Sequence, residues 1–217
     1  MLTFSTHNSK LKLLAKYLKL PQNQVVSFDI PAGWTCPKAD ICKTFTIRET
    51  GKQKRVGRVL CYASKAELYA PNCRIMRWRN FDQLRACKGN HNKMFTLLLD
   101  SLPTNAKVVR IHSSGDFFSK SYFLAWAGLA VAFPDISFYG YTKILDYVIS
   151  PLPDNFYLHY SYGSKDDKRW NPEIPTCFIK EREGQYPEYS VICNGEGTEH
   201  EDYFHILARK SFVIPAH

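Results

Sequence analysis

The stretch AKVVRIHSSGDFFS, residues 106–119, decides the fold class that we predict for this chain. It opens with apolar and β-branched residues and closes with a polar cluster, which is typical of a buried strand that leads into a helix. The helix is expected to continue through Trp126 to about Ala132. Other segments repeat this alternation of strand and helix along the chain.

The remaining predicted elements follow the same order. Helices are expected at residues 9–20, 61–69 and 76–99, strands at residues 24–30, 135–142, 155–162, 188–193 and 211–217, and a β-hairpin at residues 44–60 that turns at residues 49–52. Strands separated by helices favour an α/β fold with a mostly parallel sheet and flanking helices. We therefore predict a single α/β domain over residues 1–217, with an incomplete or distorted barrel as the alternative form of its sheet.

The composition is that of a folded chain without an export signal. Of the 217 residues, 45% are hydrophobic and 14% are aromatic, which is enough to build a core. No run approaches eighteen uncharged apolar residues, and four lysines interrupt the first twenty residues, unlike a signal peptide. We expect a cytoplasmic protein with no membrane partner. In that reducing compartment, seven cysteines favour free thiols or metal ligands over disulfides.

Three of the cysteines are spaced so that they can meet. The segment PAGWTCPKADIC, residues 31–42, holds Cys36 and Cys42, and Cys61 follows the predicted hairpin. Because the two ends of a hairpin lie together, Cys42 and Cys61 are expected to be neighbours. Converging thiolates suit an iron–sulfur cluster, whereas zinc favours CxxC pairs, which this sequence lacks. By spacing alone, the three residues could also be small core residues.

Polar side chains occur where the predicted strands end. In parallel α/β sheets, ligands gather at the carboxyl ends of the strands. The candidates for a substrate pocket there are Arg110, His112, Asp116, Lys143 and Tyr162. Arg110 and His112 alternate with apolar residues, so they are expected to share one face of the sheet. His112 suits a base, a metal ligand or a satisfied polar residue, and Asp116 suits a cap of the following helix.

The chain is basic, with 29 Lys and Arg against 20 Asp and Glu. A net charge of +9 makes attraction to a phosphate backbone plausible. The densest basic stretches are residues 48–58 and 72–80, and the second places Trp78 among arginines that could neutralise phosphates while the ring stacks on bases. The alternative is an exposed helix face with Trp78 turned into the core.

Six segments form an ordered pattern through most of the chain. They are NSKL (8–11), FDIPAGWTCPKADIC (28–42), CYA (61–63), RWRN (77–80), RIHSSGDFFSKSYFLAW (110–126) and FYGYTK (138–143). This pattern resembles the gene product 88 family of bacteriophages. The resemblance implies a phage or prophage origin, hence the host cytoplasm, and a cysteine pattern similar to that of barrel-like iron–sulfur proteins distantly like radical S-adenosylmethionine enzymes. It implies a site and no particular reaction.

The chain departs from that family pattern at two points. The hairpin at residues 44–60 reads as an insertion between the second and third cysteines. The C-terminal part keeps Cys193 and few other thiols, so Cys193, at the end of a predicted strand, is the fourth ligand that we expect. Rivals for that position are Cys73 and Cys177, and a zinc site formed by Cys193 with His200, His205 and His217 is a further alternative.

The predicted function is that of a phage-encoded protein that binds an iron–sulfur cluster, most simply [4Fe–4S], through Cys36, Cys42, Cys61 and Cys193. Its role would be redox, structural or catalytic. One alternative is a basic phage protein that binds nucleic acid or a host protein, in replication or host control, with a structural metal site. Another is a radical S-adenosylmethionine enzyme, although the cysteine spacing departs from the compact CxxxCxxC of that class.

Overall fold

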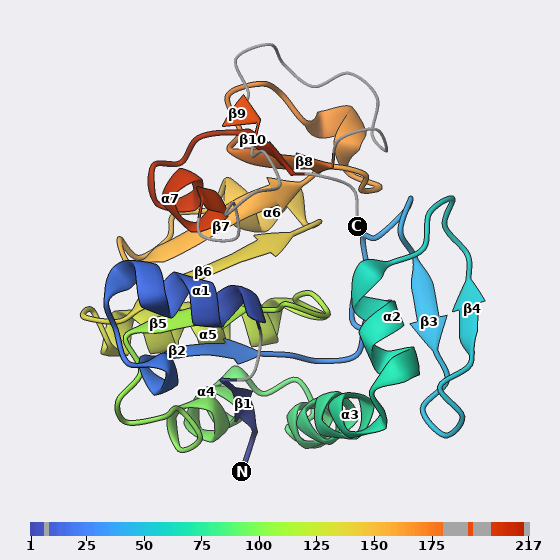
Figure 1. The fold of residues 1–217 in the computed structure, drawn as a ribbon, viewed down its shortest axis with the longest axis horizontal. Coiled ribbons are helices and arrows are strands. Elements are labelled where there is room, and N and C mark those ends of the chain that lie inside the picture. Colours follow the sequence, from blue (N-terminus) through green and yellow to red (C-terminus); the bar gives the residue numbers. More distant parts are fainter. Residues whose placement is uncertain (7–8, 180–190, 193–200, 215–217) are drawn as a thin grey trace.

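The computed structural model describes residues 1–6, 9–179, 191–192 and 201–214, which contain an eight-stranded sheet (Figure 1). The strand order is β1-β2-β5-β6-β7-β8-β10-β9, and every neighbouring pair is parallel except β1 and β2. The predicted α/β class with a mostly parallel sheet is confirmed, and the described strands form an open sheet. Their bounds are β1 (Phe4–Ser5), β2 (Val25–Phe28), β5 (Val108–Ile111), β6 (Ser137–Thr142), β7 (Phe156–Ser161), β8 (Thr176–Ile179), β9 (Val191–Ile192) and β10 (Phe212–Ile214).

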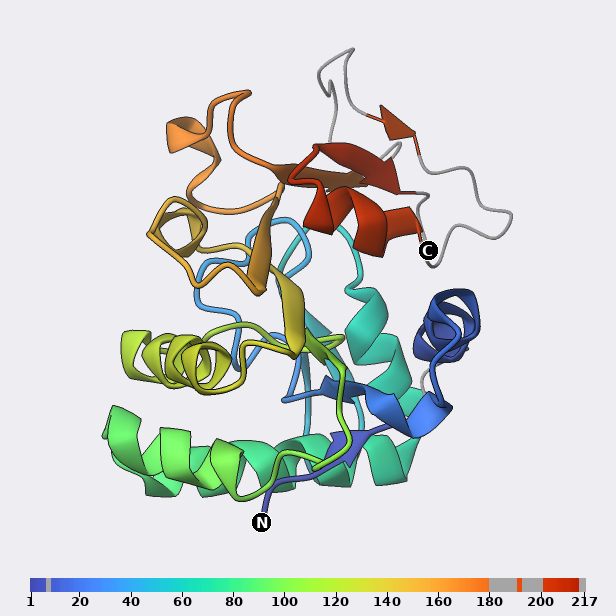
Figure 2. The same cartoon turned by 90° about the vertical axis from the view of Figure 1, so that its left-hand side faces the viewer.

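Helices cover both faces of the sheet (Figure 2). One face packs on α5, with α3 and α4 completing the same core, and the opposite face carries α1 and α7. The helices are α1 (Ser9–Leu18), α2 (Tyr62–Tyr69), α3 (Pro71–Ala86), α4 (His91–Leu99), α5 (Lys120–Ala132), α6 (Leu145–Val148) and α7 (Glu201–Leu207), with 3-10 turns at Gln22–Gln24 and Asp167–Arg169.

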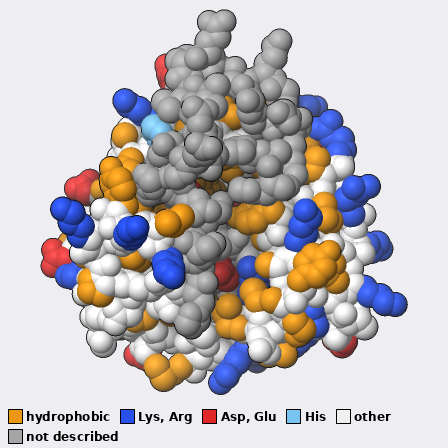
Figure 3. Space-filling view, in the orientation of Figure 1, with side chains coloured by type: hydrophobic (Ala, Val, Ile, Leu, Met, Phe, Trp, Pro, Cys, Tyr) orange, Lys and Arg blue, Asp and Glu red, His pale blue; other side chains and the backbone are white. Residues whose placement is uncertain are grey.

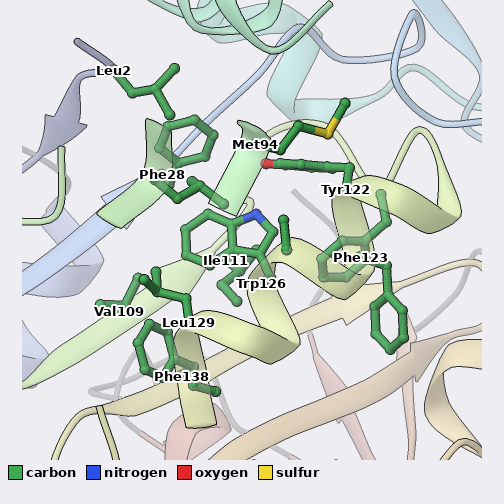
Figure 4. Packing of buried hydrophobic residues seen from close by; sticks show 14 of the residues in the cluster. Leu2, Phe28, Met94, Val109, Ile111, Tyr122, Phe123, Trp126, Leu129 and Phe138 are labelled. Atoms are coloured by element: carbon green, nitrogen blue, oxygen red, sulfur yellow. The ribbon is translucent and has the colours of Figure 1, made fainter. Parts of the chain in front are cut away.

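The central strands are apolar on both faces because both faces are covered. On the α5 side, Val109 and Ile111 pack with Phe138 against Trp126 and Leu129 (Figure 4). Each of these large side chains contributes about 1.5–3 kcal/mol by leaving water. On the other side, residues of β2, β5, β6 and β10 pack against α1 and α7. This rigid sheet fixes the positions of the loops at its carboxyl edge.

The helix predicted over residues 76–99 is two helices. The chain turns between α3 and α4 at Lys88 and Gly89, which have φ angles of 50° and 75°. Asn90 then caps α4, since its side chain accepts a hydrogen bond from the Lys93 backbone N–H at 3.1 Å. Because the apolar pattern continues through this turn, the sequence predicts a single helix.

The predicted hairpin is confirmed. Strands β3 (Thr44–Thr46) and β4 (Gln53–Arg55) pair antiparallel as a separate two-stranded sheet. Figure 1 shows them beyond α2, at the right-hand side of the molecule. Helix α2 begins directly after Cys61, so the hairpin and its flanking cysteines form one projecting unit beside the main sheet.

Candidate metal centre at the carboxyl edge of the sheet

The loops that follow β2, β5 and β7 meet at one edge of the sheet, as expected for parallel strands. Ile30 N–H donates to the carbonyl of Ser114 at 3.1 Å, and Ile41 N–H donates to the carbonyl of Gly163 at 3.3 Å. The loop after β2 therefore runs from the end of β5 to the end of β7. This loop carries the first two cysteines of the predicted site.

Two glycines shape this loop. Gly33 has a φ of 75°, and a Cβ placed on it would lie 2.1 Å from the Thr44 carbonyl oxygen, so only glycine fits there. Gly115, with a φ of 90°, also lies close to the loop, because an added Cβ would be 2.7 Å from Thr35 Oγ1. These close contacts fix the backbone of the loop that carries Cys36.

The base of the hairpin brings Cys42 and Cys61 together. Val59 N–H donates to the Ile41 carbonyl at 2.8 Å, and Cys61 N–H donates to Thr44 Oγ1 at 3.3 Å. The strands leave and return at neighbouring points, as the sequence predicts for the ends of a hairpin. The hairpin therefore leaves the two thiols adjacent.

The thiols of Cys36, Cys42 and Cys61 are free and interact with one another. A hydrogen bond donated by Cys61 lowers the pKa of Cys42 to about 6, so Cys42 favours the thiolate at neutral pH. The same hydrogen bond, together with burial, raises the pKa of Cys61 well above its ordinary value. Burial raises the pKa of Cys36 to about 12, with Asp116 adding to the effect.

A buried lysine and a buried aspartate border the thiols. Asp116 accepts hydrogen bonds from Thr142 Oγ1 at 2.7 Å and from Lys143 N–H at 2.9 Å, which joins the loops after β5 and β6. Burial raises the pKa of Asp116. Lys143 Nζ donates to the Tyr162 carbonyl at 2.7 Å, and its positive charge lowers the pKa of both Cys36 and Cys42. Lys143 therefore favours thiolate at this edge.

A buried glutamate also contacts the loops that form the site. Glu67 of α2 is fully buried, and its Oε1 accepts from Ala32 N–H at 2.9 Å, Arg77 Nη1 at 3.0 Å and Ser114 Oγ at 3.3 Å. It thus connects α2 and α3 with the loops after β2 and β5. The sequence does not single out Glu67, because a charged residue in a helix is usually exposed.

The prediction that Arg110 and His112 share one face is wrong. His112 has a φ of 68°, which ends the alternation of the strand and turns its ring toward α5. There its Nε2 lies 2.9 Å from the Tyr122 hydroxyl, and burial lowers its pKa to about 3, so it is neutral. Arg110 lies on the opposite face, with its guanidinium 5.6 Å from the ring of Tyr141.

Two other predicted roles change. The ring of Tyr162 packs against Trp170, so this residue presents its backbone carbonyl to Lys143. Asp116 does not cap the following helix, because α5 begins later, where Ser119 Oγ accepts from a backbone N–H. Asp116 instead connects two loops of the site.

Of the three arginines in residues 72–80, Arg79 is exposed, whereas Arg74 and Arg77 are buried and are not available to a nucleic acid. Arg74 is buried and donates to the carbonyls of Arg48 at 2.9 Å and Glu67 at 2.6 Å. Arg77 is buried and forms an ion pair with Glu67, and Trp78 lies in the core. Trp78 is turned into the core, as the alternative predicts, but the exposed helix face that it also predicts is wrong for Arg74 and Arg77.

The other candidate ligands lie elsewhere or outside the described part of the chain. The charged neighbours of Cys73 are Arg77, Asp29 and Glu67, and burial raises its pKa. Cys177 is packed in the apolar cluster between the sheet and α7. Within that region, His205 packs against Phe212. Cys193, His200 and His217 lie outside the described residues.

The donor set suits soft metal chemistry, although its arrangement is not that of a single-ion site. Within residues 1–6, 9–179, 191–192 and 201–214, no group of three or more His, Cys, Asp or Glu side chains is placed so that it could hold a metal ion. The three interacting thiols nevertheless supply sulfur ligands of the kind that iron–sulfur clusters require.

Comparison with known proteins places this chain among phage proteins. The model of the gene product 88 family matches residues 2–206. The chain belongs to this family. Its relatives include the gene 88 proteins of Mycobacterium phage L5, 30% identical over 114 residues, and of Mycobacterium phage D29, 31% identical over 94 residues.

The matched segments are partial. They cover 47% of this chain and 47% of the phage L5 protein, and 39% of this chain and 38% of the phage D29 protein. The chain thus matches less than half the length of these curated relatives. No solved structure matches it. Among the described helices, none has the length and apolar character needed to span a bilayer.

Proposed function

We propose that the chain binds an iron–sulfur cluster, most simply [4Fe–4S], through Cys36, Cys42 and Cys61. The observation that supports this is the convergence of three free thiols from two loops at the carboxyl edge of a parallel sheet. Ligands of α/β folds gather at this edge, and thiolates are the usual ligands of such clusters.

Among the described residues the thiols do not form a single-ion site, and a cluster does not require one. In a cluster, each cysteine binds a different iron atom, so the ligands lie farther apart than those around one ion. Cys42 already favours the thiolate, and Lys143 supplies a positive charge beside the anionic sulfurs. Gly33 and the base of the hairpin would hold the ligand loops in place.

Cys193 is the fourth ligand that we propose. It follows β9, which is parallel to β10 and β8, so its strand ends at the same edge of the sheet. The loop with Cys36 and Cys42 extends to the end of β7, toward that side. Four cysteines would saturate the cluster, which suits electron transfer, redox sensing or bracing of the fold, whereas three would leave an iron open, as a radical S-adenosylmethionine enzyme requires.

The test is oxygen-free expression and purification, followed by a visible absorption spectrum and analysis of iron and acid-labile sulfide. We expect a brown protein with about four irons per chain, as for a cubane cluster. Single Cys→Ser variants at residues 36, 42, 61 and 193 should each lower the iron content. Cys87→Ser is the matched control, since the Cys87 thiol donates only to the Gln83 carbonyl. A folded, colourless, iron-free protein would contradict the proposal.

A second candidate function is nucleic-acid binding by the hairpin. Its side chains Lys52, Lys54, Arg55 and Arg58 are exposed. Within the described part of the chain, none of these four forms an ion pair. Figure 3 shows Lys and Arg side chains along the right-hand edge of the molecule, where Figure 1 places β3 and β4. Closely spaced free cations on a projecting hairpin suit a phosphate backbone.

A further inference from the structure

Arg110 is a buried cation in the middle of the sheet. It lies on β5 and is 4% exposed. Its side chain is on the face covered by α1 and α7, opposite the α5 core. Its neighbours there are aromatic: Tyr139 and Tyr141 of β6 and Tyr62 of α2. A guanidinium in this position is removed from water and surrounded mainly by rings and hydroxyl groups.

The described part of the chain gives this guanidinium no direct counterion. No carboxylate oxygen of these residues lies within 4.0 Å of its nitrogen atoms, and Nε has no hydrogen-bond partner. The buried Arg77 differs, because Glu67 pairs with it at 3.0 Å. An uncompensated buried charge destabilises a fold, and an apolar side chain of similar size is usually more stable in its place.

An acidic residue that acts on Arg110 is also incompletely bonded. Asp202 of α7 is buried, and it acts electrostatically on Arg110 without forming an ion pair with it. Asp202 Oδ2 accepts a hydrogen bond from the Tyr141 hydroxyl at 2.7 Å, whereas Oδ1 has no partner. Tyr141 thus contacts both Arg110 and Asp202. Arg110 Nε and Asp202 Oδ1 each remain without a hydrogen-bond partner.

From these two incompletely bonded groups, each with one atom that has no partner, we infer that Arg110 and Asp202 form a binding site for an α-amino acid or a compound that contains one. The carboxylate of the ligand would bind the Arg110 guanidinium, whose planar donors match a carboxylate. The amino group of the ligand would donate to Asp202. A phosphate, with nearly two negative charges, suits the site less well because Asp202 would repel it.

The site borders the thiol centre. Tyr62, which interacts with Arg110, directly follows Cys61, and its hydroxyl donates to the Ser113 carbonyl at 3.0 Å in the loop after β5. A ligand held by Arg110 would therefore lie beside the loops that carry the thiols. The inference does not depend on a bound cluster, since it rests on side chains of β5, β6 and α7.

Ligand-observed NMR with the full chain tests this inference. The probes are single L-amino acids at millimolar concentration, each compared with its amide and its N-acetyl derivative, and inorganic phosphate. At least one amino acid should bind, and both derivatives should bind at least tenfold more weakly. Arg110→Met should weaken binding at least tenfold, and Asp202→Asn should abolish the preference for the amino acid over its N-acetyl form.

The stability of the variants separates a binding role from a structural one. If Arg110 is retained for a ligand, Arg110→Met should melt at the same temperature as the unliganded wild type or higher. A lower melting temperature together with no amino-acid binding would show that Arg110 serves only as a structural partner of Asp202. Binding of phosphate but of no amino acid, or of no probe at all, would also overturn the inference. The Cys36, Cys42 and Cys61 variants should bind amino acids unchanged, which keeps this outcome apart from that of the iron analysis.

Discussion

The thiols of Cys42 and Cys61 interact across the base of hairpin β3–β4, and this interaction lowers the pKa of Cys42 and raises that of Cys61. The pairing of Thr44 with Arg55 and the hydrogen bond between Val59 and Ile41 hold the two chain segments together. The backbone structure of the hairpin base therefore positions the two cysteines without a metal.

Gly33→Ala should destabilise the fold by about 2–3 kcal/mol. The substitution combines the cost of a positive φ with a Cβ that would meet the Thr44 carbonyl oxygen at 2.1 Å. Gly89→Ala is the control, because Gly89 has the same φ of 75° but no atom within 4 Å of an added Cβ, so about 1 kcal/mol is expected. Urea unfolding followed by circular dichroism measures both values. Equal losses would mean that the close approach at Gly33 carries no cost.

Glu67→Gln should lower the free energy of unfolding by about 3–5 kcal/mol, because it leaves the Arg77 guanidinium buried without its counterion. The exposed pair of Asp146 and Arg169 is the comparison. Its side chains are more than half exposed, so Asp146→Asn should cost at most about 1 kcal/mol. Denaturant titration of both variants tests the contrast. A Glu67→Gln protein as stable as the wild type would show that the buried pair makes no net contribution.

Stability should fall as the pH is lowered from about 6.5 toward 4. Burial lowers the pKa of His159 to about 4, so in this window the unfolded chain binds a proton that the folded chain does not. Its Nε2 must carry the proton, since it lies 2.9 Å from the Lys210 carbonyl, which can only accept. The loss is on the order of 3 kcal/mol across the window and is absent above about pH 7.

His159→Gln isolates this contribution. Glutamine keeps a hydrogen-bond donor and does not titrate, so its unfolding free energy should depend less on pH between about 7 and 4.5 than that of the wild type. His112, whose pKa burial lowers to about 3, contributes a parallel loss that the variant retains. An unchanged pH profile in His159→Gln would show that His159 has the same pKa in the folded and the unfolded chain.

If the hairpin binds nucleic acid, neutralising it should weaken binding and its dependence on salt. Replacement of Lys52, Lys54, Arg55 and Arg58 by Gln removes up to four phosphate contacts, so the slope of log K against log salt should fall by about 3 in magnitude. Fluorescence anisotropy with a labelled oligonucleotide measures it. A control with the exposed lysines Lys88, Lys93, Lys107 and Lys120 changed to Gln keeps the net charge equal. Equal effects of the two sets would point to nonspecific attraction alone.

The sequence predicts the hairpin and most strands of the sheet, where local pattern and tertiary environment agree. Apolar runs such as residues 108–111 are strands because both faces are buried, and the Gly51 region turns the hairpin as its composition indicates. The α3 to α4 turn and strand β8 escape prediction. The first lies within a continuous apolar pattern, and the second is only the short run TCFI with weak alternation.

The candidate site is partly predictable. Neighbouring thiols at Cys42 and Cys61 follow from hairpin closure alone. The faces of Arg110 and His112 do not, because they depend on one backbone angle at His112 that the sequence pattern does not reveal. Glu67 is missed since its burial arises from contacts between four separate elements.

The closed base of the hairpin also bears on how this region can change in evolution. Because Lys43 accepts hydrogen bonds from Val56 and Gly57, the segment beyond that point is anchored independently of its length. Lengthening it costs only a slowly growing closure entropy. Homologous chains can therefore gain or lose residues at the tip, and acquire or discard its cations, without disturbing the sulfurs beneath.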